Sequence, residues 1–127
     1  IILGNGKNIA PQPIENKLKE SPYIAEAVLF GDGMDHCVAL IVPKDESVRH
    51  ALNLPETARL SENAEAKALL KKEIDRLNRG LASYEMVKRH AVLDEPFSIE
   101  NGELTPSMKV KRKVVKEKFA DLLASMR

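Results

Sequence analysis

The fold of this chain is decided by one stretch, Tyr23-Ile24-Ala25-Glu26-Ala27-Val28-Leu29-Phe30-Gly31-Asp32-Gly33-Met34-Asp35-His36-Cys37-Val38-Ala39-Leu40-Ile41-Val42. Residues 23–30 combine alternation with β-branched side chains, and residues 36–42 are nearly all apolar, as is typical of a central strand. The segment 31–35 between them is made of turn residues. The stretch therefore predicts an antiparallel hairpin at the centre of the domain.

Helices are expected before and after this hairpin in the sequence. Ile14 and Leu18 lie four residues apart and predict a short helix that ends near Glu20, and residues 47–52 predict a turn or two of helix. We expect Ser61 to cap a longer helix. Two apolar stripes at helical spacing mark that helix and a terminal one, Ala66, Leu70, Ile74, Leu77 and Leu81, then Val115, Phe119, Leu122, Leu123 and Met126.

The remaining segments predict a short strand at 90–93 and two tight turns. Asn5-Gly6 and Asn101-Gly102 are each flanked by apolar residues, which is a strong hairpin signal because both turn positions tolerate positive φ. The predicted fold is α+β, a small, mainly antiparallel sheet covered by about three helices. We expect one domain, residues 1–127.

Composition excludes several classes of protein. The net charge of +1 gives no strong field for nucleic acid or an anionic membrane. No apolar run approaches the roughly 20 residues of a membrane span, and Cys37, the single cysteine, cannot form an internal disulfide. The chain opens on Ile1-Ile2-Leu3 without methionine, so we expect a fragment of a longer protein.

Motifs for metal, nucleotide or hydrolase chemistry are missing. His36, His50, His90 and Cys37 do not have metal-ligand spacing, so no metal site is predicted. No serine has a nucleophile-elbow context. The glycine spacing of a phosphate-binding loop is missing, so we expect any ATP site to be completed by residues outside this sequence.

Lys109 is the residue most suited to chemistry. Thr105-Pro106 stiffens the approach to it, and a helix from Arg112 anchors the exit. An ammonium group held this way can stabilise the negative charge of a phosphate or carboxylate. A solvated lysine ahead of a basic helix explains the same pattern without any function, and Lys111 carries the same charge two residues later.

Asn5, Gly6, Lys7 and Asn8 form a second candidate loop. The bare backbone at Gly6 would permit close approach of a ligand chain. A plain hairpin turn explains the same residues without a ligand.

The basic run in the C-terminal part is open to a nucleic-acid interpretation. Glu117 and Asp121 interrupt it, and aromatic residues make up only 4% of the chain, so a stacking platform is not expected. We interpret the run as a solvated helix face and predict no nucleic-acid partner, while a non-catalytic binding domain stays an alternative. The run consists of Lys109, Lys111, Arg112, Lys113, Lys116 and Lys118.

Two separated motifs resemble one family. Residues 6–15, Gly-Lys-Asn-Ile-Ala-Pro-Gln-Pro-Ile-Glu, resemble the stretch that opens the C-terminal domain of adenylate-forming enzymes. Residues 104–112, Leu-Thr-Pro-Ser-Met-Lys-Val-Lys-Arg, resemble the last motif of that family, which carries its catalytic lysine. Met108 stands where the family commonly has glycine, and its context is most similar to long-chain fatty acid–CoA ligases.

The resemblance implies a reaction in two steps, in which a fatty acid and ATP form an acyl-adenylate and coenzyme A then displaces AMP. It implies ATP, Mg²⁺ and CoA as cofactors of the full-length enzyme, with the Mg²⁺ ligands outside this chain. Lys109 would serve the first step. Asn5, Gly6, Lys7 and Asn8 would line the CoA tunnel in the second step, after rotation of this domain against its own N-terminal domain.

The resemblance leaves further points open. We expect the chain alone to be inactive, because the N-terminal domain and the hinge are missing from it. Another adenylate-forming ligase with a different acid is the near alternative. We expect a cytoplasmic enzyme, with peripheral membrane association of the full-length protein as an open possibility. The acyl chain length, the oligomeric state and regulation by lysine acylation are not decided by the sequence.

Overall fold

The computed structural model describes all 127 residues as five α-helices, one 3₁₀ helix and three strands. None of the helices combines the length and the apolar character needed to cross a bilayer. In chain order the elements are α1 (Pro11–Leu18), β1 (Ile24–Phe30), β2 (Cys37–Pro43), α2 (Asp45–Leu52), α3 (Ala64–Asn78), η1 (Ser83–Glu85), β3 (Val87–Val92), α4 (Arg112–Lys118) and α5 (Ala120–Ser125).

The predicted hairpin is confirmed. β1 pairs antiparallel with β2, with Val28 opposite Leu40, and β2 is the central strand in the order β1-β2-β3. All seven residues of β2 are buried, as its nearly continuous apolar sequence predicted. The α+β class is confirmed as well.

The sheet differs from the expected pattern in one pairing. β3 runs parallel to β2, with Ala39 opposite His90, so the sheet is mixed and not mainly antiparallel. A parallel pair requires a long crossover connection between its strands. Here α2 and α3 lie in that connection and return the chain to the same end of the sheet before β3 begins.

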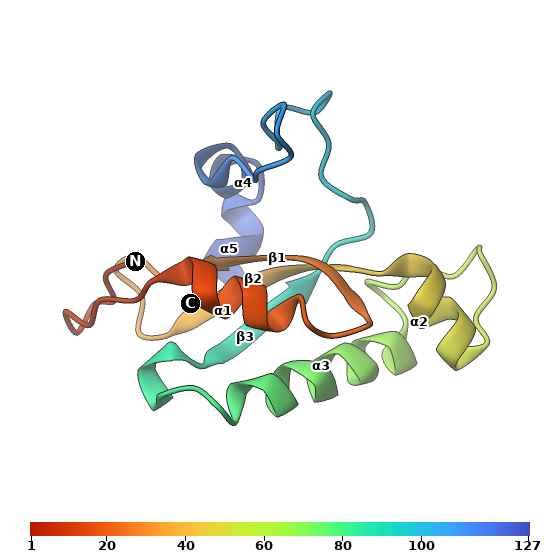
Figure 1. Cartoon of the computed structure of the whole chain (residues 1–127), viewed down its shortest axis with the longest axis horizontal. Helices are drawn as coiled ribbons and strands as arrows, with labels where there is room; N and C mark the ends of the chain where they lie inside the picture. The colour runs from red at the N-terminus through yellow and green to blue at the C-terminus, as the bar shows by residue number, and fades with distance from the viewer.

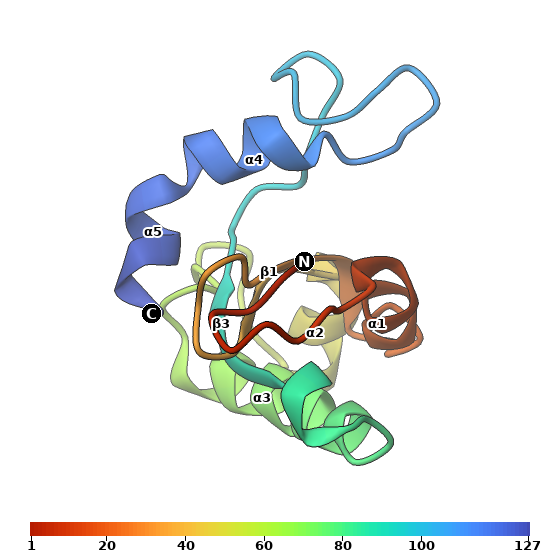
Figure 2. The same cartoon turned by 90° about the vertical axis from the view of Figure 1, so that its left-hand side faces the viewer.

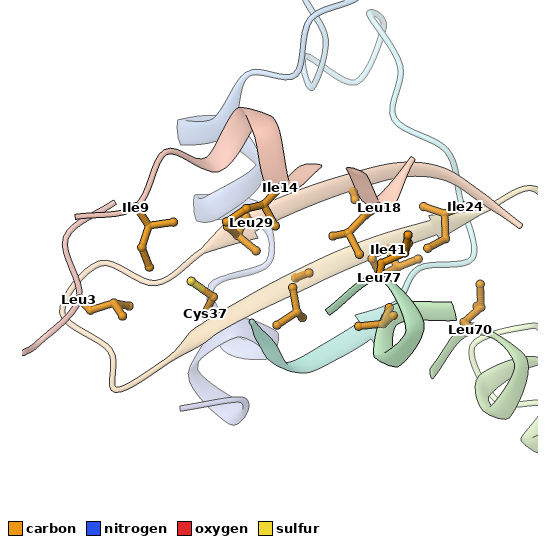
Figure 3. Close-up of a cluster of buried hydrophobic side chains, with 14 residues drawn as sticks. Leu3, Ile9, Ile14, Leu18, Ile24, Leu29, Cys37, Ile41, Leu70 and Leu77 are labelled. Carbon is orange, nitrogen blue, oxygen red and sulfur yellow. The ribbon is translucent and has the colours of Figure 1, made fainter. Parts of the chain in front are cut away.

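Helices cover both faces of the sheet, which gives three layers (Figures 1 and 2). Alternate residues of β2 point to opposite faces, so Ile41 packs against α1 and α3 and Leu40 packs against α4 and α5. The core on the α1 and α3 side includes Leu3 and Ile9, which flank the Asn5-Gly6 turn (Figure 3). The turn is therefore fixed at its base by buried side chains.

Two helix boundaries differ from the predictions. Asn63, not Ser61, caps α3, because its side-chain oxygen accepts a hydrogen bond from the backbone N–H of Ala66 at 2.9 Å. Ser61 instead donates to Asp94. The predicted terminal helix is divided at Phe119 into α4 and α5, so with α2 five helices replace the expected three.

The single cysteine gives a test of the core. Cys37 is fully buried, and burial raises the pKa of its thiol from 9.0 to about 11. At pH 8 the thiolate fraction should therefore be roughly a hundredfold lower in the folded chain than in the unfolded chain. We expect iodoacetamide to label Cys37 at least about a hundredfold more slowly in buffer than in denaturant. Equal labelling rates would show that this part of the core is open.

Candidate functional site

The loop that carries Lys109 is closed by its own hydrogen bonds. Leu104 and Val110 form an antiparallel bridge, and the N–H of Thr105 donates to the carbonyl of Lys109 at 2.8 Å. The N–H of Met108 donates to the carbonyl of Thr105 at 2.8 Å, which makes a β-turn. The N–H of Lys109 donates to the Thr105 hydroxyl oxygen at 3.0 Å. This short hairpin holds the backbone of Lys109 in one conformation.

Met108 takes the backbone conformation that favours glycine. Its φ is +67°, and 63% of the residue is exposed. A β-turn followed by a left-handed residue is a common design for a three-residue hairpin loop. A side chain at such a position costs roughly 1–2 kcal/mol, because its Cβ crowds the following carbonyl. The departure from glycine noted in the sequence therefore lies at a strained position.

Replacing Met108 with glycine is expected to stabilise the chain. The left-handed strain is relieved, while the greater freedom of glycine in the unfolded chain offsets about 0.5–1 kcal/mol of the gain. We expect the thermal midpoint of Met108→Gly to rise by a few degrees, roughly 2–4 °C. Met108→Ala keeps the strain and should show no rise. A lower midpoint for Met108→Gly would mean that contacts of the methionine side chain outweigh the strain.

A buried carboxylate supports the loop on its N-terminal side. Glu103 is 2% exposed, and its two oxygens accept hydrogen bonds from the backbone N–H of Ser98 at 3.2 Å and from Lys118 Nζ at 3.0 Å. The carbonyl of Glu103 accepts from the N–H of Lys111 at 2.7 Å. The hairpin predicted around Asn101-Gly102 is not formed, because the residues that flank this turn belong to no strand. The turn itself is present, with Gly102 at φ +76°.

A second buried carboxylate supports the loop on its C-terminal side. Glu15, in α1, is 5% exposed and pairs through both oxygens with the guanidinium of Arg112, at 2.8 and 2.9 Å. Arg112 is the first residue of α4 and follows Lys109 by three positions. Both ends of the loop are thus held by ion pairs of buried carboxylates.

The Lys109 side chain is exposed and takes part in no ion pair or side-chain hydrogen bond of this chain. The Lys111 side chain is also exposed and unpaired, but Lys111 is the N-cap of α4 and lies outside the β-turn. An anchored backbone with an unpaired ammonium group is suited to binding an anion supplied from outside the chain.

The second predicted loop has the geometry expected for it. The carbonyl of Leu3 accepts from the N–H of Gly6, and the Asn5 side-chain oxygen accepts from the N–H of Lys7 at 3.0 Å. Gly6 has a φ of +87°, and a Cβ built on it would meet no atom within 4 Å. Asn5, Gly6, Lys7 and Asn8 are all exposed. The backbone at Gly6 is therefore open to a ligand.

The Gly6 loop also contacts a residue that the sequence did not single out. Lys7 Nζ lies 5.3 Å from the centre of the ring of Tyr84, the one exposed aromatic residue of the chain, at 39%. Tyr84 belongs to η1, far away in the sequence. No local pattern predicts this contact, because it depends on how β3 returns to the sheet.

The two candidate loops are not brought together. In Figure 1 the segment that carries Lys109 projects at the top, and the turn around Gly6 lies at the left end. The second view agrees, with the N-terminal turn facing the viewer and the Lys109 segment still at the top (Figure 2). One ligand group cannot be held by both loops in this arrangement.

Two of the six residues of the basic run take part in internal ion pairs. Arg112 pairs with Glu15, and Lys118 pairs with Glu103, so both serve the interior of the domain. The unpaired cations of the run are reduced to four, Lys109, Lys111, Lys113 and Lys116. This weakens the case for a continuous nucleic-acid surface.

Two carboxylates that belong to neither loop, Asp94 and Glu73, have lowered pKa values. Burial tends to raise the pKa of Asp94, but hydrogen bonds from Ser61 and Arg59 outweigh burial and lower it. Hydrogen bonds from Arg76 and Ser21 lower the pKa of Glu73. The structure contains no group of three or more histidine, cysteine or acidic side chains placed to hold a metal ion. Neither loop therefore contains such a cluster.

Comparison with known protein families gives a match that covers nearly the whole chain. The pattern of the AMP-binding enzyme C-terminal domain matches residues 1–126. Among similar curated proteins, the long-chain-fatty-acid–CoA ligase FadD15 of Mycobacterium tuberculosis is 33% identical over 94% of this chain, which is 21% of the ligase. The peroxisomal long chain acyl-CoA synthetase 6 of Arabidopsis thaliana is 30% identical over 98% of this chain and 19% of its own length. The chain thus spans about a fifth of the length of these relatives.

Solved structures show the same fold. The adenylation domain of a carboxylate reductase from Mycobacterium chelonae superposes with a TM-score of 0.81 at 23% identity, over 99% of this chain and 19% of that one. The corresponding domain from Segniliparus rugosus, solved with AMP and a co-purified carboxylic acid, also gives 0.81, at 24% identity, over 99% of this chain and 19% of that one.

Proposed function

The chain belongs to the family of C-terminal domains of AMP-binding enzymes, and on that basis we propose that it serves a long-chain fatty acid–CoA ligase. The intact protein would convert a fatty acid, ATP and CoA to acyl-CoA, AMP and pyrophosphate. The relatives that cover this chain carry names of that activity. The chain contributes one domain of such an enzyme, so the acyl pocket would lie in the N-terminal domain, which we propose as its partner.

One observation carries the proposal. Lys109 presents an unpaired ammonium group on a hairpin whose two ends are fixed by ion pairs of buried carboxylates. When a fatty carboxylate attacks the α-phosphate of ATP, two anions have to approach each other. A fixed cation between them offsets their repulsion and stabilises the charge that develops in the transition state.

The Gly6 loop would serve the second step. There the thiol of CoA attacks the acyl-adenylate carbonyl and AMP leaves. The exposed backbone at Gly6 fits a narrow, extended pantetheine chain, because no side chain of this domain lies near the missing Cβ. Mg²⁺ would be held by residues outside this chain, since no cluster of metal ligands exists within it.

The separation of the two loops supports two arrangements of this domain against the N-terminal domain. A single arrangement could place only one loop at the reacting carbonyl, because the loops project from different sides of the domain (Figures 1 and 2). We propose that the domain turns between the two steps and presents Lys109 first and Gly6 second.

The function is tested with the intact protein and a panel of acids. Fatty acids of increasing chain length, aromatic acids and small branched acids are each offered with ATP, Mg²⁺ and CoA, and thioester formation is measured. We expect the intact protein to form thioesters of long-chain acids. Turnover restricted to another class of acid would favour the near alternative, and affinity for oligonucleotides without thioester formation would favour a binding domain.

A further inference from the structure

The ion pair of Glu15 and Arg112 is completed by the edge of the sheet. Glu15 Oε2 accepts the backbone N–H of Leu29 at 2.6 Å, and Arg112 Nη1 donates to the backbone carbonyl of Leu29 at 2.6 Å. β1 is an edge strand, so the outward N–H and C=O of Leu29 have no strand partner. The pair supplies both partners and joins α1, β1 and α4 at one point.

This junction lies next to the Lys109 loop in the sequence. Arg112 opens α4 and follows Lys109 by three residues, and Val110 is bridged to Leu104. A shift of the guanidinium would therefore move the point at which the Lys109 loop joins the start of α4. Glu15 closes one of the two motifs noted in the sequence, and Arg112 closes the other.

The geometry of the pair demands an arginine. A guanidinium donates two parallel hydrogen bonds to a carboxylate, and here Nη1 also reaches the Leu29 carbonyl. A lysine ammonium keeps the charge but cannot reproduce the planar fork. If only positive charge is needed at this position, lysine can replace Arg112. If the fixed fork geometry is needed, lysine cannot replace it.

We propose that Glu15 and Arg112 are positioning residues that fix the Lys109 loop against the edge of the sheet for the first half-reaction. The role in that reaction rests on the proposed function. Neither side chain touches a reacting atom; both act through the backbone of residues 109–112. Because a displacement of about 1 Å can cost a hundredfold in rate, loss of this junction should slow acyl-adenylate formation strongly.

The chain offers a matched control. Glu73 and Arg76 form another ion pair with a largely buried carboxylate, at 3.1 Å, and Glu73 also accepts a 2.6 Å hydrogen bond from the buried Ser21. This pair lies on α3 and takes part in neither candidate loop. A general loss of stability should affect variants of both pairs, whereas a positioning effect should affect only variants of Glu15 and Arg112.

The experiment compares Arg112→Lys, Glu15→Gln, Glu73→Gln and Arg76→Lys in the intact enzyme. Hydrogen exchange followed by mass spectrometry measures the order of peptides that cover residues 104–111, independently of activity. Single-turnover assays measure the two half-reactions separately, the second from supplied acyl-adenylate. We expect Arg112→Lys and Glu15→Gln to speed exchange in that segment and to lower acyl-adenylate formation by roughly ten- to a hundredfold. Thioester formation should change less than about threefold, since Leu3 and Ile9 hold the Gly6 loop independently.

The outcomes separate the two proposals. Unchanged exchange of residues 104–111 in both Arg112→Lys and Glu15→Gln would overturn the positioning role. So would equal loss of both half-reactions in all four variants, or faster exchange with an unchanged rate of acyl-adenylate formation. If Lys109→Ala leaves that rate intact, the proposed function of Lys109 fails and so does the catalytic part of this inference. The exchange data would still report whether the pair orders the loop.

Discussion

Replacing Lys109 with alanine in the intact enzyme is expected to lower the rate of acyl-adenylate formation by at least about a hundredfold. Removal of one fixed group that stabilises developing negative charge typically costs a factor of 10²–10³. Lys109 is exposed and unpaired within this chain, so its loss should leave the fold unchanged. The measurement is single-turnover acyl-adenylate formation from a fatty acid and ATP.

The same variant provides its own control in the second half-reaction. The Gly6 loop lies away from Lys109, so thioester formation from supplied acyl-adenylate should stay within a few-fold of the wild-type rate (Figures 1 and 2). A parallel loss in both steps would point to a folding defect, or to a lysine that serves both steps.

Enlarging Gly6 to leucine is expected to produce the opposite pattern. The left-handed backbone at φ +87° disfavours any side chain by roughly 1–2 kcal/mol, which lowers the population of this backbone conformation by about a factor of ten. The added bulk also fills the space proposed for pantetheine. Thioester formation should fall at least about tenfold, and acyl-adenylate formation should change little. Both steps are measured separately, as for Lys109→Ala.

Gly6→Ala separates backbone strain from bulk. The alanine Cβ meets no atom of this chain within 4 Å, so the substitution introduces the strain and only one methyl group. A milder defect than that of Gly6→Leu would assign the main effect to the ligand path. Equal defects would assign it to the backbone conformation, and a Gly6→Leu enzyme with normal thioester formation would remove this loop from the CoA site.

The central hairpin could be predicted because its signal is local. The nearly continuous apolar run of β2 requires burial on both faces, and the turn residues 31–35 place β1 beside it. The turn at Gly6 could be predicted for the same reason, since its positive φ depends on the local residue types. Neither prediction needed knowledge of distant parts of the chain.

Features that depend on distant contacts could not be predicted. The parallel pairing of β3 depends on the path of α2 and α3, which strand propensity does not describe. Glu15 and Arg112 are 97 positions apart, and each resembles an ordinary surface charge in its own helix. Local signals also misled at the start of α3: Ser61 and Asn63 are both good caps, and Asp94, distant in sequence, binds Ser61.

The sequence named the candidate site residues, which stay a prediction, but not the contacts that hold their loops in place. The resemblance assigned Lys109 and residues 5–8 to two steps, and the structure adds how their loops are held. The buried carboxylates Glu15 and Glu103 anchor one loop, and buried Leu3 and Ile9 anchor the other. Under the proposed function, those anchors would keep the flexible lysine and the small turn in place through repeated catalytic cycles.

The central claim is that Lys109, and not its neighbour Lys111, acts in adenylate formation. The most direct measurement is acid-dependent exchange between ATP and labelled pyrophosphate, which reports the first half-reaction alone, in the intact Lys109→Ala and Lys111→Ala enzymes. We expect exchange to be reduced at least about a hundredfold in Lys109→Ala and to stay within a few-fold of wild type in Lys111→Ala. Exchange that survives in Lys109→Ala but is lost in Lys111→Ala would contradict it.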